Sequence, residues 1–171
     1  NSGNDWNVSG LRDILHTTLS EGTGLDIQAA QPVVVFLNGK YWGILNIREK
    51  INEDYLENNH GVDADSVDIL EGNASVNEGS AEHYQQLLSI INNSNMKLET
   101  TYNNVKNMMD VVNFAEYQIA NIYVNNTDWP GNNIKYWREQ SPNGRWRWLM
   151  FDTDFGFGIW DNNDFNDNTL E

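Results

Sequence analysis

The chain contains no cysteine and few positive charges, and both shortages limit what it can be. Without cysteine it forms neither disulfide bonds nor thiolate metal sites, although this says nothing about its redox compartment. Its 10 lysines and arginines stand against 25 aspartates and glutamates, which gives a net charge of −15. Because nucleic acids and anionic membranes are bound mainly through lysine and arginine, we expect neither as a partner. Cations and basic proteins fit this charge better.

Long apolar runs are also lacking. No stretch approaches the length of a membrane span, so we expect no membrane insertion, and residues 1–4 do not read as a signal peptide. What is present favours one folded domain: 171 residues can bury a sizeable core, and seven tryptophans and seven tyrosines supply large apolar surfaces.

The hydrophobic pattern predicts an α+β fold with a small antiparallel or mixed sheet and packed helices. Apolar strands at 32–37 and 40–48 flank Asn38-Gly39, a strong hairpin signal, and both look buried in a central sheet. A brief strand is expected at 67–70 and a polar loop at 73–79. Helices are expected at 8–20, 52–59, 82–92, 101–108 and 110–124.

The stretch 125–158 contains the strongest functional signal. It reads as a loop with Asp128 and Asn133, a hairpin of strands 132–137 and 145–151, and a second loop with Asp152 and Asp154. A hairpin returns the chain to its starting point, so the two acidic loops should lie side by side. Carboxylates and an amide around one cleft suit Mg²⁺ bound together with a nucleotide.

Protein kinases use the same order of parts: an Asp, an Asn five residues later, a hairpin, and then Asp-Phe-Gly. Here these are Asp128, Asn133 and Asp154-Phe155-Gly156. The His-Arg pair that usually precedes the kinase Asp is absent, and Asn126-Thr127 stands in its place. A glycine-rich phosphate loop and a lysine of the Val-Ala-Ile-Lys type are also missing.

The chain resembles the CotH kinase family, atypical kinases related to spore-coat proteins. The matching segments are 1–5, 36–52, 125–133 and 144–158, of which the second (FLNGKYWGILNIREKIN) and the fourth (GRWRWLMFDTDFGFG) are the specific ones. The resemblance implies a kinase-like fold that transfers the γ-phosphate of ATP to protein serine or threonine hydroxyls. The family domain normally begins earlier and ends later, so 1–171 is expected to be a single, incomplete domain: part of a larger CotH kinase-like domain, without its N-terminal and C-terminal portions.

The resemblance and the kinase order together assign roles to the acidic stretch. Asp128 is expected to orient or deprotonate the acceptor hydroxyl. Asn133 and Asp152 are expected to hold Mg²⁺ or Mn²⁺, with Asp154 as second or alternate ligand, although a plain Asp-Phe-Gly alignment would put Asp154 first. The acceptor is expected to be a protein with basic or serine-rich segments, and the location extracytoplasmic or at the cell surface.

Three further residues are candidates for contacting the nucleotide, each with a structural alternative. Glu49 closes a strand within the family match, where it contacts the nucleotide or is simply solvated. Lys135 neutralises phosphate or pairs with surplus acid. Trp146 shares a strand face with Trp148 and Met150, where it forms a wall against adenine or packs in the core.

Other classes of function remain open on the sequence alone. A secreted Ca²⁺- or glycan-binding module would suit the acidity and the tryptophans, and a glycoside hydrolase would use two of the carboxylates. The Asp- and Asn-rich tail at 161–168 is expected to form a mobile loop. Asp5 and Asp13 read as surface or capping carboxylates, and His16 as a structural histidine.

Overall fold

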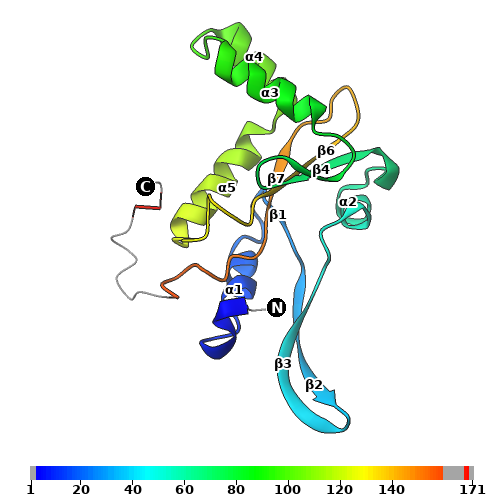
Figure 1. Cartoon of the computed structure of the whole chain (residues 1–171), viewed down its shortest axis with the longest axis vertical. Helices are drawn as coiled ribbons and strands as arrows, with labels where there is room; N and C mark the ends of the chain where they lie inside the picture. The colour runs from blue at the N-terminus through cyan, green and yellow to red at the C-terminus, as the bar shows by residue number, and fades with distance from the viewer. Residues whose placement is uncertain (1–2, 160–167, 170–171) are drawn as a thin grey trace.

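The computed structural model describes residues 3–159 and 168–169 and shows the expected mixed α+β fold (Figure 1). Its elements are η1 (Gly3–Asn7), α1 (Arg12–Leu19), β1 (Asp26–Ile27), β2 (Ala30–Leu37), β3 (Lys40–Arg48), α2 (Glu53–His60), η2 (Ala64–Ser66), β4 (Val67–Glu71), β5 (Ser75–Glu78), α3 (Glu82–Asn93), α4 (Glu99–Met108), α5 (Val111–Tyr123), β6 (Lys135–Glu139) and β7 (Arg147–Met150). Apart from Asn168, the tail expected as a mobile loop lies outside the described residues. Within them, no helix is long and apolar enough to cross a membrane.

A five-stranded mixed sheet forms the centre of the molecule, in the order β1-β7-β6-β4-β5. Strand β1 runs parallel to β7, and the other pairs are antiparallel. Strands β6 and β7 are the hairpin expected from the acidic stretch, with Tyr136 opposite Trp148. The prediction of a polar loop at 73–79 is wrong for its central part, because Ser75–Glu78 pairs with β4 as an edge strand.

Each face of this sheet packs into its own core. Side chains alternate between the faces along a strand, so Tyr136 and Trp148 lie on one face and Trp137 and Leu149 on the other. The first face carries Trp146, Trp148 and Met150 together, as the period-two pattern predicted, and packs against residues of α3, α4 and α5. The second packs against α2.

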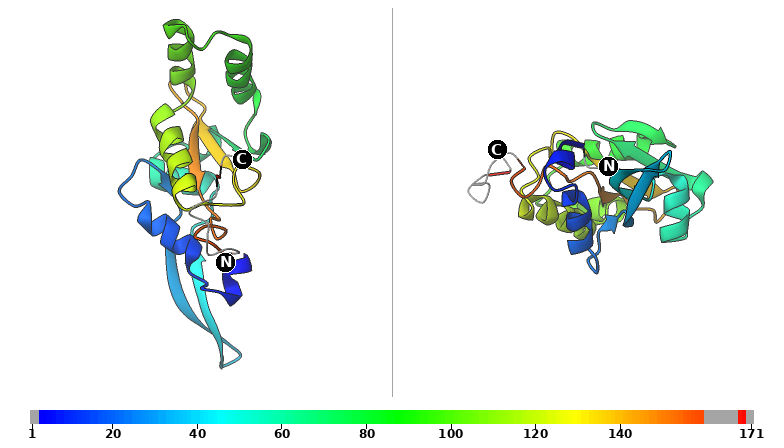
Figure 2. Two further views of the ribbon diagram at one scale, coloured as in Figure 1. Left: turned by 90° about the vertical axis from the view of Figure 1, so that its left-hand side faces the viewer. Right: turned by 90° about the horizontal axis from the view of Figure 1, so that it is seen from below.

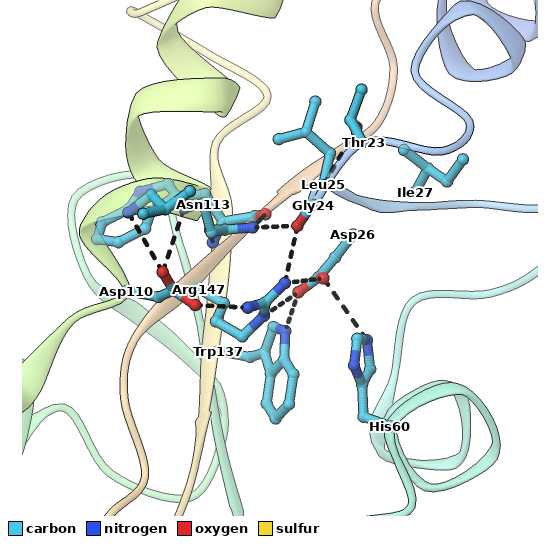
Figure 3. A network of polar contacts seen from close by, with 12 residues as sticks. Thr23, Gly24, Leu25, Asp26, Ile27, His60, Asp110, Asn113, Trp137 and Arg147 are labelled. Atoms are coloured by element: carbon cyan, nitrogen blue, oxygen red, sulfur yellow. Dashed lines mark hydrogen bonds and ion pairs between the residues drawn. The ribbon is translucent and has the colours of Figure 1, made fainter.

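An ionic network ties β1, β7 and α5 together (Figure 3). The guanidinium of Arg147 donates hydrogen bonds to Asp26 from Nε (3.0 Å) and Nη2 (2.6 Å), and to Asp110 from Nη1 (2.7 Å). Asp26, which is buried, also accepts from the indole of Trp137 at 2.8 Å. A buried carboxylate needs such pairing, so this network fixes the short strand β1 against the edge of the sheet.

The hairpin of β2 and β3 forms a separate two-stranded sheet that projects from the body (Figures 1 and 2). Asn38 and Gly39 have φ values of 50° and 76°, as the tight turn expected there requires. Burial of this hairpin in the central sheet was predicted wrongly. Val34, Phe36, Tyr41 and Trp42 are each about 60% exposed, because the described residues cover the hairpin only in part, around Trp6 and Gly10. An apolar run indicates a preference for burial and does not supply the covering element.

Candidate active site

The amide of Asn133 joins the two acidic loops. Its Nδ2 donates to the carboxylate of Asp128 at 2.8 Å and to the backbone carbonyl of Asp152 at 3.1 Å. Asn132 donates to the same carboxylate oxygen of Asp128 at 3.1 Å. The structure therefore brings Asp128, Asn133 and Asp152 to one point, and the hairpin between the loops is the reason. The donor end of the Asn133 amide is used here, so its Oδ1 is the end that can ligate a cation.

Further contacts hold the loops side by side. The hydroxyl of Thr127 donates to the carbonyl of Phe155 at 3.2 Å, and the amide of Phe157 donates to the carbonyl of Val124 at 2.7 Å. Asn133 and Asp152 both have left-handed backbone conformations, with φ of 53° and 51°. Asn and Asp tolerate this region better than most residues, and such strain persists only where surrounding contacts over-determine it.

The carboxylates of Asp13, Asp152 and Asp154 repel one another. Burial first, and then repulsion from the neighbouring Asp152 and Asp13, together raise the pKa of Asp154 to about 6. Burial also raises the pKa of Asp152, with added repulsion from Asp13, while Arg48 acts in the opposite direction. A divalent cation would offset this negative charge, and carboxylate oxygens are the ligands that Mg²⁺ takes. The donor set therefore fits such an ion.

Asp154 faces a different neighbour from Asp152. It is buried, and one of its carboxylate oxygens would lie 3.0 Å from a Cβ placed on Gly3, so it packs against η1. Asp152 is only half-buried. Of the two carboxylates, Asp152 is thus the more open to a bound ion.

Thr153, the residue between Asp152 and Asp154, is held in place by Asp13, which the sequence predicted to lie at the surface. Thr153 donates to Oδ1 of Asp13 from its backbone amide (2.6 Å) and from its hydroxyl (3.0 Å). The other oxygen of Asp13 forms an ion pair with Arg48 at the end of β3. Asp13 is buried, so the expectation of a surface or capping carboxylate is wrong. Its partner lies 140 residues away, beyond the reach of local sequence patterns.

Asp5 is likewise buried rather than exposed, but its carboxylate does cap the start of α1, where it accepts from the backbone amides of Leu11 and Arg12 at 3.1 Å. Its carboxylate accepts from the hydroxyl of Ser9 at 2.7 Å and pairs with Arg12 at 2.5 Å. Arg12 in turn donates from Nε to the carbonyl of Gly156 at 3.1 Å. Arg12 thus links the segment before α1 to the Asp-Phe-Gly loop. The spacing of acidic residues in the sequence did not predict this link.

Lys135 lies on the wall of a separate cleft of about 350 Å³, whose lining includes Phe151 but none of Asp128, Asn133, Asp152 and Asp154. Its ammonium pairs with Glu71 at 3.3 Å and lies 5.3 Å from the ring centroid of Phe151, the residue before Asp152. Lys50 also lines this cleft. Lys135 therefore pairs with an acidic side chain, which was one of its two predicted roles. It also lines a cleft in which a polar ligand fits.

Glu49 and Trp146 are not brought to this point. The carboxylate of Glu49 accepts hydrogen bonds from the backbone of Ala29 at 2.9 Å and from Asn59 at 3.2 Å, and it lines a different cleft. Trp146 is completely buried, and its indole donates to His83 at 3.0 Å. A wall against adenine needs an open ring face, so the core alternative holds for Trp146.

A wide surface cleft of about 720 Å³ opens next to Asp128. Its lining includes Thr127, Asp128, Trp129 and Asn132. Most of these residues are polar, Trp129 is the aromatic one among them, and the carboxylate of Asp128 is half-buried. A cleft of this kind suits an extended polypeptide.

In the part of the chain that the structure describes, no group of three or more His, Asp or Glu side chains is arranged to hold a metal by itself. Ca²⁺ takes about six to eight oxygen ligands, whereas Mg²⁺ is commonly held by one or two carboxylates completed by phosphates and water. A site with few protein ligands, such as Asp152 with Asn133, would take an ion in the second way.

The comparison with known families agrees with this order of parts. The family model described as CotH kinase protein matches residues 1–171, the whole chain. Among curated proteins, none matches the sequence.

Proposed function

Because this chain belongs to the CotH kinase protein family, we propose that its domain transfers the γ-phosphate of ATP to serine or threonine hydroxyls of a protein acceptor. The observation that carries the proposal is the double hydrogen bond of Asn133 to the Asp128 carboxylate and to the Asp152 carbonyl, which brings the loops of these two aspartates together. In the transfer, the acceptor oxygen bonds to the γ-phosphorus and the bond to the bridging oxygen of ADP breaks.

We assign the acceptor side to Asp128. Its Oδ2 is held by the amides of Asn132 and Asn133, so the carboxylate has a fixed orientation beside the wide cleft. The acceptor hydroxyl would donate its hydrogen bond to this carboxylate, which takes up the proton as the new phosphorus–oxygen bond forms. Positioning of the two reactants supplies much of the rate in such reactions.

We assign the nucleotide side to Asp152, Asn133 and Lys135. Asp152 and the Oδ1 of Asn133 would hold Mg²⁺ or Mn²⁺, with Asp154 as a further carboxylate behind them. The ion neutralises charge on the transferring phosphoryl group when bound. Lys135 would exchange part of its pairing with Glu71 for a phosphate oxygen, since its ammonium already lines a cleft in which a polar ligand fits.

The two roles predict different losses. Asp152→Asn should weaken both Mg²⁺-dependent ATP binding and phosphoryl transfer, because a metal ligand acts in the ground state and in the transition state. Asp128→Asn should leave ATP affinity within a few-fold and lower turnover by ~10²–10⁴, the usual scale for general acid–base help. ATP affinity is measured by calorimetry with and without Mg²⁺, and transfer by incorporation of labelled phosphate into a serine-containing basic protein.

An exposed aspartate supplies the control. Asp65→Asn removes the same charge on the surface at η2 and should change neither quantity. Wild-type protein that binds ATP equally with and without Mg²⁺ would refute the metal-assisted function. Near-normal transfer by Asp128→Asn would refute its catalytic role alone and leave the nucleotide site standing.

A further inference from the structure

A second recess, away from the acidic loops, lies between α1 and α5. It has a volume of about 220 Å³, and its walls are largely apolar, with Leu19, Leu25, Ile119 and Val124 among them. Leu19 and Ile119 at its rim are 56% and 65% exposed. We call this recess the α1–α5 groove. Its few polar atoms indicate what it binds.

The first of these atoms is Nε2 of His16. The His16 ring is completely buried, and its Nδ1 lies 3.0 Å from the hydroxyl of Thr153. That hydroxyl has one proton, which it donates to Asp13 at 3.0 Å, so it must accept from the Nδ1–H of His16. Burial lowers the pKa of His16, which favours the neutral ring. Nε2 then carries no proton and can only accept a hydrogen bond, and it has no hydrogen-bond partner.

The second atom is Oε2 of Glu116, which is shielded from solvent and also has no partner. It lies close to the backbone of Gly24, where an added Cβ would come within 2.5 Å of it. A larger residue at position 24 would make the carboxylate shift. A shielded carboxylate oxygen without a donor costs free energy, and a cation that donates a hydrogen bond would recover it.

The hydroxyls in the groove do not supply the missing donors. Ser20 uses its proton toward the carbonyl of His16 at 3.0 Å, and Thr23 uses its proton toward the carbonyl of Ser20 at 2.7 Å. Tyr123 also lines the groove and carries a third hydroxyl, on a residue that is 73% exposed. Nε2 of His16 and Oε2 of Glu116 nevertheless have no donor. A matching ligand has an apolar stem and a head that donates hydrogen bonds to these two atoms.

From this we propose that the α1–α5 groove is a docking site for a lysine side chain of a partner polypeptide. Lysine has an aliphatic stem, three donors and no acceptor, which complements apolar walls with Nε2 of His16 and Oε2 of Glu116. The net charge of −15 also favours a basic partner. The site does not depend on phosphoryl transfer, because neither Glu116 nor the apolar walls belong to the proposed catalytic set.

The proposal can be tested with four probes: a blocked Ala-Lys-Ala tripeptide, the same peptide with norleucine or with Nε-acetyl-lysine in place of lysine, and spermidine. Norleucine keeps the stem and lacks the ammonium. Binding is followed through the methyl resonances of Leu19 and Ile119 and the Nε2 nitrogen resonance of His16. The lysine peptide should shift all three saturably and bind at least ~10-fold more tightly than either substituted peptide, as expected for a charge-assisted hydrogen bond.

Two variants and a control complete the test. Glu116→Gln should weaken the lysine peptide by at least ~10-fold, and Glu99→Gln, which removes an exposed carboxylate of α4, should not. Ala120→Leu should abolish binding by filling the groove, and it covers the case in which Glu116→Gln does not fold. Equal binding of the lysine and norleucine peptides, an unchanged affinity in Glu116→Gln or Ala120→Leu, or tighter binding of spermidine than of the lysine peptide would overturn the proposal.

Discussion

Removal of the Asp13 carboxylate should be among the most damaging single changes in this fold. The carboxylate receives two hydrogen bonds from Thr153 and pairs with Arg48, whose side chain is only 14% exposed. Asp13→Ala leaves that guanidinium largely buried and unpaired, which typically costs ~3–5 kcal/mol. Because Arg48 keeps some access to water, we expect the low end, about 3 kcal/mol. This is a large share of the ~5–15 kcal/mol by which domains are stable.

Two further variants separate the charge from the hydrogen bonds. Asp13→Asn keeps an acceptor for Thr153 and should cost about half as much as Asp13→Ala. The double variant Asp13→Leu/Arg48→Met replaces the pair by apolar groups and should recover most of the loss, since buried ion pairs often add little net stability over such a replacement.

Urea unfolding followed by circular dichroism gives these free energies. The slope of the free energy against urea should be unchanged, so that the midpoint alone moves. For a chain of this size, ~3 kcal/mol corresponds to a melting temperature lower by roughly 6–12 °C. Asp65→Ala, an exposed control, should lie within ~0.5 kcal/mol of wild type. An Asp13→Ala protein as stable as that control, or a double variant no better than Asp13→Ala, would show that the pair does not hold the loop.

Three other outcomes follow from the same contacts. The folded pKa of Asp154, about 6, exceeds its ordinary value of 3.8, so the folded state binds the extra proton; stability should fall as pH rises from about 4 to about 6, and melting curves of Asp154→Asn should lose this fall. Gly156→Ala would drive a methyl into the ring of His16 and to 2.9 Å from the carbonyl of Val124, so urea unfolding should show a loss of ~1–3 kcal/mol, whereas Gly22→Ala, which has open space, should show only backbone strain. Trp42→Ser, at a 62% exposed position, should change the melting temperature little, and a large drop would show that the hairpin is covered.

Local signals in the sequence were sufficient for much of this fold. The side chain of Asn52 caps α2 by accepting a hydrogen bond from the amide of Tyr55 at 3.2 Å, and Gly61 ends the helix in a left-handed conformation; both residue types are typical of these positions. The meeting of the two acidic loops followed from a hairpin whose turn residues are explicit in the sequence. Such features depend on neighbours a few residues apart.

Contacts between distant segments were beyond that reasoning. Nothing near Asp13 in the sequence indicates a partner at Thr153, and nothing around Trp146 shows that His83 and the sheet enclose it. The β2–β3 strands carry the same apolar residues whether or not another element covers them. Burial depends on whether a second layer packs against an element. The hydrophobic pattern of β2 and β3 describes only the hairpin itself, so its burial was predicted wrongly.

The exposed hairpin has a spectroscopic consequence. Trp42 lies on β3 in contact with water, whereas Trp137, Trp146 and Trp148 are enclosed in the two cores. A soluble quencher such as iodide therefore reaches Trp42 in the folded protein and is excluded from those three. Quenching of Trp42, read as the difference between wild type and Trp42→Phe, reports on a molecule that covers the hairpin. The emission of the enclosed indoles instead follows the unfolding of the sheet. Tryptophan fluorescence can therefore report both the covering of the hairpin and the unfolding of the sheet.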